Sequence, residues 1–307
     1  MALTHDQLSA ITRRYFLPKL ADNIFDSNPT LKKIMDSGAY KSVSGGTEII
    51  VPLNYAQAAS SGWYSGADTL ATADSENITA AEYEWKSLYA GVTISEEDEL
   101  KNSGDAQVVS LLKSKMQIAE KTLKDALGTG IYSDGTTTKS IVGLRDIVAT
   151  DQTVGGFSQT DNSWWRGQVD SSTTVTTLSA LNSVYENCTI DNEKPGLITC
   201  TRAIFTYYYN LLTPAQRFVD ESTAKGGFEN LMFNGTPVVS DSHVPSSHLF
   251  MINMNHLHLF YHPKRNMEFE DFQKPINQQV KVARILWMGA LGSSNNRLHG
   301  KFSALAA

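Results

Sequence analysis

The sequence predicts an α+β fold in which one long helix carries the other elements. Three observations predict it. The stretch from Asp105 to Gly130 is amphipathic with helical spacing, two strand-like stretches flank a polar segment before it, and strand and helix patterns alternate after it. With 307 residues, 41% of them hydrophobic, the chain is long enough to bury a sizeable core and is not disordered as a whole.

The first part of the chain, residues 1–44, is predicted to be a helical arm. Pro18 interrupts an amphipathic first helix, and Asn28 followed by Pro29 starts a second helix, which Gly38 ends. A short amphipathic arm cannot bury its apolar face alone. We therefore expect it to pack on the body of the protein or on a neighbouring molecule.

Residues 45–95 are predicted to form one long β-hairpin. Alternating residues from Thr47 to Leu53 and a second run from Ala80 to Ile94 are typical of strands, and the segment between them is rich in Ala, Ser, Gly and Asp. A two-stranded hairpin is at best marginally stable in water. The hairpin should therefore need a further surface on which to lie.

Two features of this hairpin bear on function. Trp63 and Tyr64 lie near its tip, where aromatic residues either pack within the loop or anchor the loop on a partner. The stretch from Thr47 to Leu100 is also strongly acidic, with Lys86 as its single basic residue. Its acidic residues are Glu48, Asp68, Asp74, Glu76, Glu82, Glu84, Glu96, Glu97, Asp98 and Glu99.

The long helix is predicted from Asp105 to Gly130, roughly 36 Å at about 1.5 Å per residue. Its apolar face comprises Val108, Leu112, Met116, Ala119, Leu123 and Leu127. Its other faces carry lysines, and the segment from His262 to Ala307 is basic as well. The acidic and basic stretches either form solvent-exposed faces or promote self-association, in which the acidic part of one copy contacts the basic part of another.

The rest of the chain is predicted to form an α/β subdomain followed by a return to β-structure. A short strand or helix is expected over Ile141–Ile147. The segment Asp151–Thr176, with Trp164 and Trp165, is expected to be an irregular surface excursion. The further expected elements are helices at Leu178–Tyr185 and Arg202–Leu212 and strands at Gly196–Thr201, Met232–Val239, His248–Met254, Leu257–Tyr261 and Gln278–Trp287.

Catalytic and metal-binding signatures are not apparent. The sequence contains no G-x-x-x-x-G-K-[ST], H-E-x-x-H or G-x-S-x-G motif. Five of the seven histidines fall between His243 and His262, where packing within a sheet is favoured over a metal site, because no nearby Cys or carboxylate completes a ligand set. We therefore predict a protein that is not an enzyme and has no cofactor and no metal.

The compartment is constrained by cysteine content and hydropathy. Cys188 and Cys200 are the only cysteines, which favours a reducing compartment over a disulfide framework. No apolar run is long enough to span a membrane, and the N-terminus does not have the pattern of a signal peptide.

Several passages in the second half of the chain resemble a known family. They are Gly226–Asp241, Met251–Phe260, Tyr261–Phe269, Leu211–Pro214 with Arg217, and Gly143–Leu144. Together with the order of parts, they resemble the major capsid protein of tailed bacteriophages, which has the HK97-like fold. The resemblance covers nearly the whole chain and is a diffuse pattern.

The resemblance implies a division of the chain into parts. They are an N-terminal arm (1–44), an extended β-hairpin loop (45–95), a peripheral domain with the spine helix (96–148), an α/β axial domain (149–233) and a return to the peripheral and axial sheets (234–307). Some family members weld their subunits through a lysine in the extended loop. No lysine lies between Lys41 and Lys86 here, which argues against such welding.

The resemblance also implies a function. The chain would self-assemble into hexamers and pentamers of an icosahedral phage head that encloses double-stranded DNA without sequence specificity. It would be found in the virion after assembly in the host cytoplasm, with a separate scaffold, portal and decoration proteins as possible partners and no membrane. The residues expected at subunit interfaces are Trp63, Tyr64, Asp68, Asp74, Glu76, Lys113, Lys121 and Lys124.

Three alternatives stay open. An encapsulin-like nanocompartment shell would share the fold and package protein cargo. A phage or surface-array protein that does not form a shell would assemble into filaments or flat sheets. A hydrolase would use an unrecognised site within residues 180–260.

Overall fold

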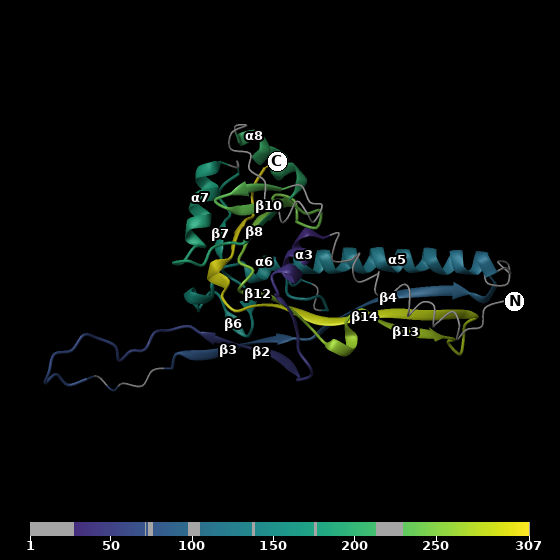
Figure 1. The fold of residues 1–307 in the computed structure, drawn as a ribbon, viewed down its shortest axis with the longest axis horizontal. Helices are drawn as coiled ribbons and strands as arrows, with labels where there is room; N and C mark the ends of the chain where they lie inside the picture. Colours follow the sequence, from purple (N-terminus) through teal and green to yellow (C-terminus); the bar gives the residue numbers. More distant parts are fainter. Residues whose placement is uncertain are drawn as a thin grey trace.

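The computed structural model describes residues 28–70, 72, 76–97, 105–136, 139–174, 177–212 and 230–306, with the backbone alone described for 105–113 and 230. The first predicted arm helix and Asp74 lie outside these residues. The described chain has a mixed α+β fold with a long helix, two main sheets and a projecting hairpin (Figure 1). No helix of the described chain is long and apolar enough to cross a membrane.

The predicted long helix is present as α5 (Asp105–Ile131). It runs beside the first sheet, in which β1, β12, β14 and β13 follow one another and β4 pairs with β14 (Figure 1). The predicted apolar face is buried at Met116, Ala119, Leu123 and Leu127. The strands of this sheet are β1 (Tyr40–Ser42), β4 (Lys86–Ser95), β12 (Leu257–Tyr261), β13 (Glu268–Gln273) and β14 (Val280–Ser293).

The hairpin is formed by β2 (Glu48–Asn54) and β3 (Ile78–Glu84), paired in register from Glu48 opposite Glu84 to Asn54 opposite Ile78. The prediction of a single strand over 80–94 is wrong. The chain leaves β2 after Glu84 and continues as β4, which pairs with β14 along ten positions. The division falls at Trp85 because the pairing partner of the chain changes there from β2 to β14.

The further surface that we expect the hairpin to need is supplied, along its paired strands, by the body of its own chain. One face of the paired strands is buried, at Ile49, Val51, Leu53, Ala81 and Tyr83. The Tyr83 hydroxyl donates to the carbonyl oxygen of Ser293 at 2.8 Å and accepts from the Ser293 amide at 3.0 Å. The base of the hairpin is therefore held by the body of its own chain.

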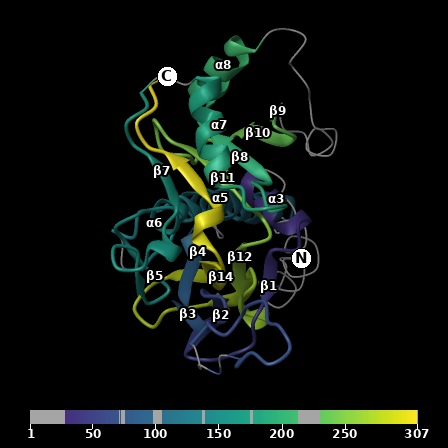
Figure 2. The same ribbon diagram turned by 90° about the vertical axis from the view of Figure 1, so that its left-hand side faces the viewer.

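The second sheet has the order β7-β15-β11-β8-β10-β9 and lies with α7 and α8 beside a second hydrophobic core (Figure 2). The predicted strand over 232–239 is instead a hairpin, because Asn234 and Gly235 adopt positive φ and turn the chain. The elements are α7 (Leu178–Asn187), α8 (Arg202–Leu211), β7 (Gln168–Asp170), β8 (Leu197–Cys200), β9 (Asn230–Phe233), β10 (Thr236–Ser240), β11 (Leu249–Ile252) and β15 (Gly300–Phe302).

The segment predicted to be a surface excursion is partly buried. Trp165 is almost fully enclosed, and its indole N–H donates to the Val154 carbonyl oxygen at 2.9 Å. The region Ile141–Ile147, predicted as a strand or helix, ends in a helix. The remaining short elements are α6 (Leu144–Ile147), β5 (Thr153–Val154), β6 (Phe157–Ser158), η2 (Ser163–Trp165), η4 (Pro263–Arg265) and η5 (Asn296–Leu298).

The helix predicted to start at Asn28 is α3 (Pro29–Asp36). Asn28 caps it, because its Oδ1 accepts from the amides of Thr30 and Leu31 at 3.1 and 3.2 Å. Leu31 and Ile34 are fully buried in the first core. This helix is therefore anchored on the body of its own chain.

Candidate assembly surfaces

The loop that joins β2 to β3 extends beyond the body of the protein at the end opposite α5 (Figure 1). Tyr55, at the start of this loop, is anchored on the body, where its ring stacks on that of Trp164 with the ring centroids 5.2 Å apart. Beyond it, Trp63, Tyr64 and Leu70 are large exposed apolar residues, and Trp63 is 105% exposed. Aromatic residues are favoured anchors at protein interfaces, so the exposed Trp63 and Tyr64 make this loop a candidate contact surface.

Asp68 has a structural role within this loop. Its carboxylate accepts from the Ser65 amide at 2.8 Å, and its own amide donates to the Ser65 carbonyl at 2.9 Å. The resulting turn lies just after the two aromatic residues. Glu76 is exposed near the other end of the loop.

The outer face of the hairpin carries an acidic group that the sequence analysis did not single out as a site. Glu48, Glu82 and Glu84 share this face because the register places Glu48 opposite Glu84 and Ile50 opposite Glu82. The charge of Glu82 raises the pKa of Glu48, whereas a 2.7 Å ion pair with Lys86 lowers the pKa of Glu84. Like charges so close to one another are unfavourable in an isolated sheet. Only the strand register reveals this grouping.

The lysines predicted at the interface lie on α5. Lys121 is exposed and Lys124 is half-buried, whereas the side chain of Lys113 lies outside the described part of the chain. The structure does not bring these lysines together with the hairpin loop, which projects in the other direction (Figure 1). A contact between the two surfaces therefore requires two copies of the chain.

The histidine-rich segment is occupied by structural contacts. Burial lowers the pKa of His258 to about 4, consistent with the predicted packing role in a strand. His256 Nδ1 lies 2.8 Å from Ser294 Oγ, and its Nε2 lies 3.9 Å from Glu193 Oε2, which also accepts from two asparagine side chains. These bonds fasten the end of β14 to neighbouring turns. Among the described residues, no group of three or more His, Cys, Asp or Glu could hold a metal ion.

Both cysteines are free and buried. Desolvation raises the pKa of the Cys188 thiol to about 12 and that of Cys200 further, so neither is a thiolate near neutral pH.

Comparison with known proteins identifies the fold. No protein-family model matches the sequence, and no curated protein matches it. Among solved structures, the capsid asymmetric unit of cyanophage A-1(L) aligns with a TM-score of 0.68 at 14% identity, covering 90% of this chain and 92% of that one. The capsid of the native GTA particle aligns with a TM-score of 0.61 at 10% identity, covering 91% and 90%.

An encapsulin is similar too. The holo-SrpI encapsulin complex from Synechococcus elongatus aligns with a TM-score of 0.54 at 13% identity, covering 87% of this chain and 84% of that one. The fold of the described chain is thus the one shared by these phage capsid, GTA capsid and encapsulin structures. The chain is similar to these proteins along nearly its whole length.

Proposed function

We propose that the chain is the major capsid protein of a tailed bacteriophage and that it builds an icosahedral head from hexamers and pentamers. The observation that carries the proposal is the projecting hairpin loop, whose Trp63, Tyr64 and Leu70 are exposed at the end of a capsid-like fold. Burying one such side chain contributes about 1.5–3 kcal/mol, so a contact repeated around a shell is strongly favourable.

The mechanism of assembly is a head-to-tail contact. The hairpin loop of one copy lies across α5 and the first sheet of the next copy, with Trp63 and Tyr64 as anchors. Asp68, Asp74 and Glu76 then face Lys113, Lys121 and Lys124. Such a contact is heterologous, and it closes into rings when the rotation allows. Each exposed ion pair contributes only about 0–1 kcal/mol, so the charges set orientation more than affinity.

The finer assignments follow from this proposal. The five parts of the chain bounded at residues 44, 95, 148 and 233 act as arm, extended loop, peripheral domain, axial domain and returning strands. Support comes from the last part, which supplies β12–β14 to the first sheet and β10, β11 and β15 to the second.

Packaged double-stranded DNA is contacted through phosphates alone. Scaffold, portal and decoration proteins complete the particle, which assembles in the host cytoplasm, and the chain has no enzymatic role.

A second candidate function is an encapsulin-like shell, favoured by the similarity to the encapsulin from Synechococcus elongatus. The wall would be built in the same way in both cases. The contents differ, because a phage head holds DNA and a nanocompartment holds protein.

Electron microscopy of the purified chain at high protein concentration tests the proposal. We expect hollow, closed particles of uniform diameter. Filaments, flat sheets or a persistent monomer would contradict a shell. Particles isolated from cells should contain nuclease-protected DNA, and mass spectrometry that finds a single cargo protein instead would establish the second candidate.

A further inference from the structure

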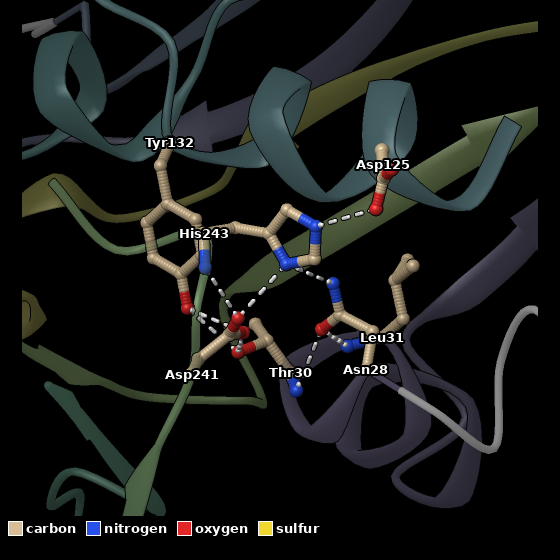
Figure 3. Close-up of polar contacts among 7 residues, drawn as sticks. All are labelled: Asn28, Thr30, Leu31, Asp125, Tyr132, Asp241 and His243. Carbon is tan, nitrogen blue, oxygen red and sulfur yellow. Dashed lines mark hydrogen bonds and ion pairs between the residues drawn. The ribbon is translucent and has the colours of Figure 1, made fainter. Parts of the chain in front are cut away.

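A buried polar cluster joins α3, the C-terminal end of α5 and the segment after β10 (Figure 3). At its centre is Asp241, which directly follows β10 and whose carboxylate is 1% exposed. Its Oδ2 accepts from Thr30 Oγ1 of α3 at 2.9 Å and from the hydroxyl of Tyr132, the residue after α5, at 3.2 Å. Its Oδ1 accepts from the backbone amide of His243 at 3.0 Å.

The imidazole of His243 links this buried carboxylate to the surface of α5. Its Nδ1 lies 3.0 Å from Asp241 Oδ1, and Nδ1 must be the donor because an ionised carboxylate only accepts. Its Nε2 points at Asp125 Oδ1 on α5, at 3.7 Å (Figure 3). A Cβ built at Gly128 would lie 2.6 Å from the ring, so the imidazole rests directly on the helix.

The surroundings of His243 favour its charged form. Two carboxylates face the ring, Asp241 on its own segment and Asp125 on α5. From α3 comes the uncharged amide of Asn28, whose Nδ2 is 3.4 Å from Nδ1 and cannot donate to it while Nδ1 is protonated. Asp134 and Arg145 line the same groove and are paired with each other at 2.8 Å. The hydrogen bond to Asp241 and the two carboxylate charges raise the pKa of His243 against the opposing effect of burial.

We propose that His243 is a pH-dependent clasp that fastens the C-terminal part of α5 to the segment after β10. When both ring nitrogens are protonated, His243 bridges Asp241 and Asp125. It thereby links α5, which packs on the first sheet, to the end of β10 in the second sheet. When Nε2 loses its proton, the bond to Asp241 remains and the link to Asp125 is lost. The clasp therefore adjusts how firmly the two halves of the subunit are joined.

The direction of the pH effect follows from linkage. The folded chain binds the His243 proton more tightly than the unfolded chain, so the contribution is fully present below the ordinary histidine pKa and is lost as pH rises through the raised folded value. For Asp241, burial opposes ionisation, but the bonds from His243 and Thr30 outweigh it and lower the pKa. Its contribution is lost only as pH falls through that lowered value. The clasp is therefore complete in mildly acidic solution and weakens toward alkaline pH.

Amide hydrogen exchange of the subunit or of the assembled particle, measured at pH 6 and at pH 8.5, tests the clasp. The exchange rates at the two pH values are compared after correction for the pH dependence of the intrinsic exchange rate. We expect the amides of the last turns of α5 to exchange about two- to fivefold faster at pH 8.5, the range of a partly exposed ion pair. His243→Gln and Asp125→Asn should each abolish this dependence, and Asp125→Asn leaves the buried bonds of Asp241 intact.

His248→Gln is the matched control, because His248 is a half-buried histidine at the other end of the same β10–β11 connection, and its Nδ1 contacts the Ser246 carbonyl. It should retain the pH dependence of the unmodified chain. Protection of α5 that is independent of pH in the unmodified chain would overturn the proposal. So would the same pH dependence in Asp125→Asn. Both outcomes are independent of whether shells form.

Discussion

Replacing residues 56–76 by the dipeptide Asn-Gly is expected to yield a folded subunit that forms no closed shells. The Tyr55 amide donates to the Asn77 carbonyl at 3.1 Å, so the two arms already meet where the short turn would close them. Among the hairpin residues that the structure describes, the buried ones lie between Ile49 and Tyr83 and outside the deleted segment. The free energy of unfolding should therefore change by less than about 0.5 kcal/mol.

Electron microscopy and chemical denaturation measure the two parts of this prediction. Trp63→Ala should weaken assembly and Trp63→Phe should largely restore it, because the aromatic anchor is retained. Shells of ordinary size and yield from the shortened chain would remove the loop from the mechanism. A shortened chain that fails to fold would show instead that the loop has a structural role.

Leu123→Ala is expected to produce the largest loss of stability among the substitutions considered. Leu123 is fully buried on the face of α5 that packs on the first sheet, and removal of such a side chain costs about 2–5 kcal/mol. Ile118 lies on the same helix but is 63% exposed, so Ile118→Ala should change the free energy of unfolding by less than about 0.5 kcal/mol.

Urea denaturation of the isolated subunits compares the two variants. Equal losses would mean that α5 does not pack through the face that the structure assigns. Because Ile118 is exposed in a single copy, an effect of Ile118→Ala on assembly alone would place that side chain in a contact between copies.

The elements that sequence predicts well are those with local signals. The 3.6-residue spacing of Met116, Ala119, Leu123 and Leu127 predicts α5, and Asn28 with Pro29 predicts α3. The turn at Asn234 and Gly235 also carries a local signal, and the prediction of one continuous strand there overlooked it.

Other features depend on contacts between distant residues. The division of the hairpin strand at Trp85 depends on β14, which lies nearly two hundred residues away. The burial of Trp165 and the contact between Tyr83 and Ser293 are equally non-local. Strands β1 and β13 are short or irregular and were not predicted.

The candidate site also combines residues that have a local sequence signal with residues that are brought together only by contacts between distant parts of the chain. Trp63 and Tyr64 are visible in the sequence as aromatic residues in a polar loop, and the structure places them in the open. The acidic face of Glu48, Glu82 and Glu84 requires the strand register. The clasp at His243 requires α3, α5 and β10 to meet, which no local pattern reveals. The interface roles of all eight residues named from the sequence stay predictions: Trp63, Tyr64, Asp68, Asp74, Glu76, Lys113, Lys121 and Lys124.

Photo-crosslinking from position 63 in shells assembled from a mixture of ¹⁴N- and ¹⁵N-labelled subunits tests the central claim most directly. A photoreactive phenylalanine analogue in place of Trp63 should join peptides of mixed isotopic composition, with the second peptide from α5 or from the first sheet. Crosslinks confined to one isotope would show that the loop contacts its own chain, and the proposed wall contact would be wrong.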